Sequence, residues 1–387
     1  MAPTAAAAQR AALLVVAAAS CLVSAGALRF NKRDVDKERT WDISLFDTEA
    51  RTSGAPWSLY PAGQVPGHTQ AHGPESYEND TVRVLCGNAS IKIFADVSRP
   101  MLVPFQVLPS DRRYTKERAD TAVIVMPGGC RKCLDWMVEG IDIALWLNEI
   151  GFSAFVLKYR VPDTSHHDAD MDAQRAVSLL RHKAPDLGLN ASRIGVIGFS
   201  AGGTLAQSIT FRPNRLYSYV DEVDDVSFRP DFTMLVYSSA EYTPKSWTRP
   251  QPPPLFVVAA MDDPFFSAGP DLSFIRNFLP QLPSDPFEGP IPLKNAVELH
   301  VFPEGGHGYG RCTIIGGFSV LPQVCIWPEL AKQFIEKQVL GIEPPVQQEI
   351  HRKLFELRNL TVNFKDPYSY PFHVPNVPKE ISNPPPP

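Results

Sequence analysis

The residue of this chain best placed to do chemistry is a serine between two glycines, Ser200 in the pentapeptide GFSAG (198–202). The stretch 193–198 before it is apolar and typical of a strand, and the stretch 201–210 after it is typical of a helix. A strand that turns directly into a helix needs small residues where the two backbones pass, and it presents the side chain at its tip. The pattern fits a nucleophilic serine, and it also fits a small residue filling a tight corner.

A serine hydroxyl needs a histidine base, and that base needs a carboxylate to orient it. At a strand-to-helix turn of this kind the chain order is serine, then acid, then histidine. His307 lies in the glycine-rich stretch PEGGHGYG, just after the last predicted strand, and is the expected base. The acid is expected after the strand PLFVVAA, where Asp262 and Asp263 are adjacent. We favour Asp263, with Asp262 as a turn former or hydrogen-bond partner.

An acyl-transfer site also needs backbone N–H groups directed at the developing oxyanion. One is expected from Ala201, which directly follows the serine. The others are expected from Gly128 and Gly129 in the stretch MPGGC (126–130), which follows the first strand of a regular alternation. The alternative is an ordinary glycine turn at this place.

A second cluster, SHHDADMD (165–172), contains two histidines and three aspartates and could bind a metal ion. Two adjacent histidine rings cannot easily reach one ion together with the aspartates. The same residues are typical of a loop that enters a helix, with acids stabilising the helix N-terminus. We therefore predict no metal site.

Strands and helices alternate regularly through the middle of the chain. The predicted strands are 121–126, 152–160, 193–198, 232–238, 254–260 and 296–302, and the predicted helices are 140–151, 170–184, 201–210 and 328–341. Short apolar strands alternating with helices indicate an α/β fold, a mostly parallel sheet covered on both faces. In such sheets ligands bind at the carboxyl ends of the strands.

The first 27 residues are typical of a secretory signal peptide. Arg10 precedes an apolar, alanine-rich run, and Ala25-Gly26-Ala27 offers a cleavage site. We expect a secreted protein with no membrane span after signal removal; a signal anchor is the alternative. Glycosylation triplets follow, and they fit a secretory protein. The candidate asparagines are Asn79, Asn88, Asn190 and Asn359.

The chain has six cysteines, and Cys21 lies within the signal, so five remain in a compartment where disulfides form. Cys312 and Cys325 flank a short loop and are the expected pair. The pairing of Cys86, Cys130 and Cys133 stays open, and one thiol must be left over. The CxxC spacing of Cys130 and Cys133 lies in no sequence typical of a thioredoxin helix.

The composition, 44% hydrophobic and 20% charged, is that of a globular protein, and the net charge of −5 is mild. No basic stripe indicates nucleic-acid binding. We expect four parts: the signal peptide (1–27), an N-terminal segment with early strands (28–119), a catalytic α/β domain (120–343) and a proline-rich extension (344–387).

These stretches together resemble one family of α/β-hydrolases, the acetyl xylan esterases and bacterial feruloyl esterase-like (BD-FAE-type) enzymes. The resemblance spans about residues 120 to 340 and is carried by AVIVMPGG, RIGVIGFSAGGTLA, PPLFVVAAMDDPF and VELHVFPEGGHGYG. It implies a triad of Ser200, Asp263 and His307, oxyanion donors at Gly128, Gly129 and Ala201, and no cofactor. The chain departs from the usual pattern at Pro127, where a histidine is usual although proline is familiar in the xylan-esterase branch, and at Cys130, where a third glycine is usual.

The resulting hypothesis is a secreted serine carboxylesterase acting on short acyl esters, with carbohydrate esters as the substrate class that the resemblance suggests. Two alternatives are a serine peptidase of the prolyl-oligopeptidase type and a non-catalytic binding protein on a hydrolase scaffold. The peptidase family carries an aromatic residue where this chain has Ala201. Non-catalytic relatives commonly lack triad residues, which are all present here.

Overall fold

The computed structural model describes residues 52–67, 73–84, 87–163, 167–238, 253–267, 297–312, 322–342 and 352. The chain divides into two compact units, Met1–Gly341 and Ile342–Pro387. All described residues except Ile342 and Arg352 belong to the first unit. The predicted signal peptide and Asn359 lie outside the described residues, as does nearly all of the predicted extension.

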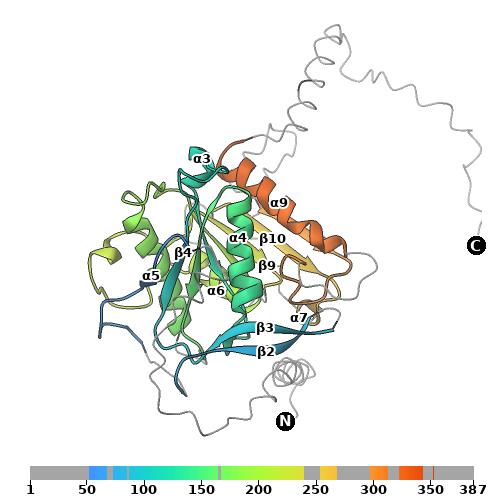
Figure 1. Cartoon of the computed structure of the whole chain (residues 1–387), viewed down its shortest axis with the longest axis horizontal. Helices are drawn as coiled ribbons and strands as arrows, with labels where there is room; N and C mark the ends of the chain where they lie inside the picture. The colour runs from blue at the N-terminus through green and yellow to red at the C-terminus, as the bar shows by residue number, and fades with distance from the viewer. Residues whose placement is uncertain are drawn as a thin grey trace, which may run out of the picture. The chain divides into compact units, whose positions relative to one another are not determined.

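The centre of the first unit is an eight-stranded sheet with the order β1-β4-β7-β5-β8-β9-β10-β11 (Figure 1). β1 and β4 pair antiparallel at one edge, and the six strands from β7 to β11 run parallel. The strand bounds are β1 Trp57–Ser58, β4 Met101–Phe105, β5 Ala122–Met126, β7 Ser153–Lys158, β8 Ile194–Phe199, β9 Phe232–Val236, β10 Leu255–Ala260 and β11 Val297–Phe302. The predicted α/β fold with a mostly parallel sheet is confirmed.

Helices cover both faces of this sheet (Figure 1). α4 (Asp142–Glu149) and α9 (Trp327–Phe334) share one face, where Trp146 and Trp327 pack edge to face at 5.4 Å between ring centroids. α5 (Asp168–Lys183) and α6 (Ala201–Phe211) pack on each other across the other face. Because each apolar strand of the sheet centre is buried on both sides, β5, β7, β8, β9 and β10 have no exposed residue.

The remaining helical elements are short. They are α3 Lys116–Ala119, the π-helical turn η1 Met137–Ile141, the 3₁₀ turn η2 Glu222–Asp225, α7 Pro264–Ser267, the 3₁₀ turn η3 Gln323–Ile326 and the π-helical turn η4 Ile335–Val339. The helices predicted at 140–151 and 328–341 therefore each combine an α-helix with a π-helical turn, at the start of the first and at the end of the second.

The N-terminal segment is built into the sheet that carries the site. β1 and β4 extend the central sheet, so that sheet begins well before residue 120. β2 (Ser76–Val84) and β3 (Gly87–Ala95) form an antiparallel hairpin within the segment where early strands were expected. The short β6 (Cys133–Leu134) adds to β3 and comes from the loop that follows β5. The hairpin therefore supports the glycine-containing loop after β5.

Within the ranges given above, no helix combines the length and the apolar character needed to cross a membrane.

A buried ion pair joins β7 to the segment before β2. Lys158 Nζ bonds Glu75 Oε1, and both side chains are buried. Burial lowers the pKa of Lys158 to about 8 although Glu75 opposes that shift, so desolvation outweighs the attraction. The pair therefore fixes where the two segments meet without adding much net stability.

Removing one partner of this pair should be costly, and removing both should not. We expect Glu75→Gln to lower the free energy of unfolding by about 3 kcal/mol, because Lys158 is left buried without its anion. The double variant Glu75→Leu/Lys158→Met should lie within about 1 kcal/mol of the wild type. Urea denaturation of the three proteins measures this. A Glu75→Gln protein as stable as the wild type would contradict the account.

Candidate active site

Ser200 occupies a strained turn between β8 and α6. Its backbone angles are φ 48° and ψ −119°, outside the regions that a serine ordinarily adopts. A Cβ atom added at Gly198 would lie 2.2 Å from the carbonyl oxygen of Gly202, and one added at Gly202 would lie 2.1 Å from that of Met126. Both glycines are therefore required by close backbone approach. The Ser200 N–H donates to Val236 O of β9 at 3.1 Å and fixes the turn to the next strand.

Three side chains from three strand ends meet at this turn. His307 Nε2 lies 2.8 Å from Ser200 Oγ, and His307 Nδ1 lies 2.8 Å from Asp263 Oδ2. Because a carboxylate only accepts, Nδ1 carries the proton and Nε2 is free to accept the serine proton. The residues follow β8, β10 and β11, which are parallel, so their carboxyl ends meet at one edge of the sheet.

The structure distinguishes the two adjacent aspartates by their partners. Asp263 is 2% exposed, bonds His307 through Oδ2 and accepts the Phe265 N–H at 2.8 Å through Oδ1. Asp262 is exposed, and its Oδ1 accepts the N–H of Gly306 at 2.7 Å. Asp263 is therefore placed to orient the imidazole, and Asp262 holds the loop that carries it.

Aromatic rings hold the imidazole of His307 from two directions. The Phe265 ring lies 4.5 Å from it between centroids, and the Tyr237 ring meets it edge-on at 5.0 Å. Two rings restrict the rotation that would break either hydrogen bond of the imidazole.

The glycine loop after β5 differs in one respect from the sequence expectation. The N–H of Gly128 donates to Glu139 Oε2 at 2.6 Å, so this donor is already engaged. A glycine is needed at position 128 because the loop passes close to Ser200: a Cβ atom there would lie 2.8 Å from Ser200 Cβ. In the part of the chain that the structure describes, the N–H groups of Gly129 and Ala201 have no backbone acceptor. These two remain as candidate oxyanion donors, and the expectation for Gly128 is corrected.

The rest of this loop is shaped by positive φ angles. Gly129 has φ 124°, and Cys130 has φ 55° although it is not glycine. Cys130 is disulfide-bonded, while Cys133 is a reduced thiol whose Sγ lies 3.7 Å from Gly129 O. Pro127 O accepts the Tyr159 hydroxyl at 2.7 Å. Pro127 and Cys130, the two residues at which the sequence was expected to depart from the family pattern, thus lie in the loop beside Ser200.

Glu139 is the residue of the site that sequence reasoning missed. It lies in η1, is 2% exposed, and accepts the Tyr237 hydroxyl at 2.8 Å as well as the Gly128 N–H. Burial, with the nearby Asp135 charge, raises its pKa to about 8. The one signal in the sequence was an acid inside an otherwise apolar stretch, and such an acid is more often exposed on a helix.

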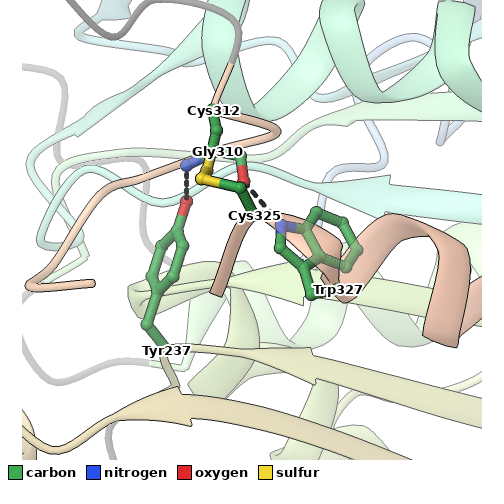
Figure 2. Close-up of a disulfide and its surroundings, with 5 residues drawn as sticks. All are labelled: Tyr237, Gly310, Cys312, Cys325 and Trp327. Carbon is green, nitrogen blue, oxygen red and sulfur yellow. Dashed lines mark hydrogen bonds between the residues drawn. A yellow bond between two sulfur atoms is a disulfide. The ribbon is translucent and has the colours of Figure 1, made fainter. Parts of the chain in front are cut away.

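The loop that carries His307 is anchored from behind (Figure 2). The Gly310 N–H donates to the Tyr237 hydroxyl at 3.1 Å, and Trp327 Nε1 donates to Gly310 O at 2.8 Å. The expected partners Cys312 and Cys325 form a disulfide next to these bonds. The loop therefore has both covalent and hydrogen-bonded support.

The acidic cluster at 165–172 is used in ion pairs and at a helix start. α5 begins at Asp168. Asp172 bonds the Arg160 guanidinium at 2.8 Å, and Asp170 lies 3.5 Å from Arg131 and also bonds Ser208. His166 lies outside the described residues. Among all the residues that the structure describes, no group of three His, Cys, Asp or Glu side chains is placed to hold a metal ion.

The candidate glycosylation sites fall in different places. Asn79 and Asn88 lie in β2 and β3. Asn190 lies before β8, and its side-chain oxygen accepts the Ser192 N–H at 2.9 Å. This bond forms a local turn around the triplet.

Part of the chain that carries this site is similar to a known protein family. Residues 116–234 match the BD-FAE family. The matched segment includes Ser200 and the glycine loop but ends before Asp263 and His307. The resemblance to α/β-hydrolase serine esterases of this type is therefore confirmed for the segment 116–234, which contains the strand-to-helix turn at Ser200.

Two curated relatives match over the same part of the chain. An acetylxylan esterase of Xylanibacter ruminicola is 29% identical over 116 residues, covering 30% of this chain and 22% of the relative. An endo-1,4-beta-xylanase B of Butyrivibrio fibrisolvens is 30% identical over 119 residues, covering 30% of this chain and 19% of the relative. The chain thus spans about a fifth of the length of these relatives.

A solved structure matches over a longer part of the chain. The acetyl ester-xyloside bifunctional hydrolase of Caldicellulosiruptor lactoaceticus is 25% identical, with a TM-score of 0.54. The match covers 75% of this chain and 98% of the hydrolase. The α/β-hydrolase fold is therefore shared beyond the segment 116–234.

The disulfide beside the site should contribute stability. Cys312 and Cys325 are 13 residues apart, and a closed loop of that length limits the unfolded chain by about 3 kcal/mol. We expect Cys312→Ser/Cys325→Ser to lose about that much free energy of unfolding. Cys133→Ser, which removes a thiol and no disulfide, is the matched control and should stay within about 1 kcal/mol of the wild type. Equal stability of all three proteins in urea denaturation would refute the estimate.

Proposed function

We propose that this chain is a secreted serine carboxylesterase that hydrolyses short acyl esters, with esterified carbohydrate as its substrate class. The observation that carries the proposal is the unbroken hydrogen-bonded series Ser200–His307–Asp263 at a strained strand-to-helix turn. Such an arrangement activates a hydroxyl for attack on an acyl carbon. The rings of Phe265 and Tyr237, which contact the imidazole, help to maintain it.

The reaction proceeds in two halves. Ser200 Oγ attacks the ester carbonyl carbon while His307 Nε2 takes the serine proton, and the Asp263 carboxylate stabilises the resulting imidazolium. The tetrahedral intermediate collapses, the C–O bond to the alcohol breaks, and His307 returns the proton to the leaving alkoxide. Water then attacks the acyl-enzyme with His307 as base, and Ser200 departs with the proton as the acid is released.

The negative oxygen of each tetrahedral intermediate needs donors, which we assign to the N–H groups of Gly129 and Ala201. Ala201 is the first residue of α6, so its N–H also lies at the positive end of a helix. Gly129 directly follows Gly128, whose N–H is bonded to Glu139. Two fixed donors of this kind typically contribute several kcal/mol to transition-state stabilisation.

The substrate class rests on what the relatives are named for. One curated relative is an acetylxylan esterase, one is a xylanase, and the solved structure is an acetyl ester-xyloside hydrolase. These names favour an acetyl group on a sugar for this chain. The predicted signal at 1–27 and the glycosylation triplets support a secreted enzyme acting outside the cell.

Covalent labelling tests the nucleophile directly. A fluorophosphonate probe should modify the wild-type protein at one residue, Ser200, and should not modify Ser200→Ala. Ser238, a serine in the segment that follows β9, offers a matched control, and Ser238→Ala should label like the wild type. Peptide mapping by mass spectrometry identifies the residue. Folded wild-type protein that takes up no probe would favour the non-catalytic alternative.

Substrate panels distinguish the acyl group and the alcohol. We expect p-nitrophenyl acetate to be cleaved faster than the butyrate and octanoate esters, and acetylated xylan to release acetate. A preference for proline-containing peptide amides would instead favour the peptidase alternative. Release of ferulate in place of acetate would keep the esterase and change its acyl group.

The adjacent aspartates should differ sharply in their effect on catalysis. Asp263→Asn should lower kcat on p-nitrophenyl acetate by about 10⁴-fold, because an amide at this place favours the wrong imidazole tautomer. Asp262→Asn keeps an oxygen that can accept the Gly306 N–H, so kcat should fall less than about 10-fold. Steady-state kinetics of the two variants decides between them. The opposite order would assign the orienting role to Asp262.

A further inference from the structure

A buried carboxyl group lies directly behind the glycine loop and takes no part in the chemistry described above. Glu139 is 2% exposed and comes from η1, between β6 and α4. Burying a carboxyl costs free energy unless its oxygens are bonded. Both oxygens of Glu139 are bonded, and each bond leads to a different part of the site.

The first bond fixes the loop next to Ser200. Oε2 accepts the N–H of Gly128 at 2.6 Å. Gly128 has no space for a side chain, because a Cβ atom there would lie 2.6 Å from Glu139 Oε2 and 2.8 Å from both Phe199 O and Ser200 Cβ. The position of the next N–H, that of Gly129, therefore follows from where Glu139 holds Gly128.

The second bond leads to the loop that carries His307. Oε1 accepts the Tyr237 hydroxyl at 2.8 Å, and the same hydroxyl accepts the Gly310 N–H at 3.1 Å. Figure 2 shows Tyr237 rising from the end of β9 to this N–H, beside the bond from Trp327 to Gly310. The Tyr237 ring also contacts His307. One carboxyl thus connects the glycine loop with the histidine loop.

The count of protons in this network favours the ionised carboxyl. Gly128 brings a donor to one oxygen, and Tyr237 brings a donor to the other. A proton on Oε2 would face the Gly128 N–H. A proton on Oε1 would have to donate to the Tyr237 oxygen, which already accepts from Gly310, and the tyrosine would lose its acceptor. All four groups are satisfied together only when Glu139 carries its negative charge.

We propose that Glu139 is a positioning residue of the esterase, whose ionised carboxylate holds the Gly128–Gly129 loop in its oxyanion-binding position and, through Tyr237, ties that loop to His307. The assignment rests on the proposed esterase function. It places the residue behind the reacting atoms, with no contact to substrate. It also explains why an acid is retained at a site where burial opposes its charge.

The charge state of Glu139 gives the proposal a pH signature. Burial raises its pKa from the ordinary 4.5 to about 8, and the charge of Asp135 acts in the same direction. Among the described residues, Tyr159 and Tyr237 also interact with Glu139, and burial raises the pKa values of both above their ordinary range. These tyrosines stay neutral around pH 8. Catalysis should therefore increase as pH rises through about 8, where Glu139 loses its proton.

The stability of the protein should change in the opposite direction over this range. The unfolded chain has lost the Glu139 proton above about pH 4.5, while the folded protein retains it up to about pH 8. Between these values the folded state binds more protons than the unfolded state, so the free energy of unfolding falls as pH rises. Glu139→Gln should remove that part of the slope.

The test compares three variants of the full chain in p-nitrophenyl acetate hydrolysis. Glu139→Gln keeps the shape but can accept only through one atom, so we expect kcat to fall about 10- to 100-fold with KM changed less than about threefold. The rise in kcat near pH 8 should disappear. Tyr237→Phe removes the connection to Gly310 and should lower kcat by a smaller factor. Glu117→Gln, an exposed glutamate of α3, is the matched control and should behave like the wild type.

The outcomes separate this proposal from the function on which it rests. Wild-type protein without hydrolysis or probe labelling would overturn the esterase assignment itself. An active wild type with a Glu139→Gln variant of unchanged kcat and unchanged pH profile would overturn the role of Glu139 alone. If Glu139→Gln does not fold, Tyr237→Phe decides: a folded Tyr237→Phe with wild-type kcat would overturn the connection to His307.

Discussion

Close approach of backbone to backbone at the start of α6 is the constraint on which the site depends. Gly198 and Gly202 leave no room for a Cβ atom, and Gly202 packs against the end of β5 through Met126 O. Because three backbone segments meet there, Ser200 adopts a strained conformation that the surrounding strands hold in place. The same approach brings the glycine loop after β5 next to the serine. A larger residue at either position would separate the groups whose proximity the proposed chemistry needs.

Polar contacts around the site convert this proximity into a defined geometry. Asp262 and Asp263 hold the histidine loop and its imidazole, while Trp327 and the Cys312–Cys325 disulfide support that loop from behind. Glu139 and Tyr237 connect it to the glycine loop. In a buried environment each unsatisfied polar group is costly, so a network of this kind has few alternative arrangements. The reacting side chains need this rigidity because small displacements reduce catalysis strongly.

Much of the fold could be predicted from the sequence, because its signals are local. The apolar strands and the helix expected at 170–184 appear in the structure near their predicted bounds, and the N-terminal segment contains early strands as expected. The π-helical turn η1 was not predicted, since its residues have the composition of the helix that follows it. The entry of β1 and β4 into the central sheet was not predicted either. Strand pairing joins residues far apart in the chain, and short strands carry little local pattern.

The sequence by itself determined which residues the candidate site contains: a serine between glycines, a histidine after the last strand and an adjacent pair of acids, in the order that an α/β-hydrolase requires. The tertiary structure decided what each of them touches. It placed Asp263 rather than Asp262 on the imidazole, engaged the N–H of Gly128, and brought Glu139 to Tyr237, 98 residues away. Residue types and order are local properties of the chain, whereas hydrogen-bond partners and burial depend on long-range packing.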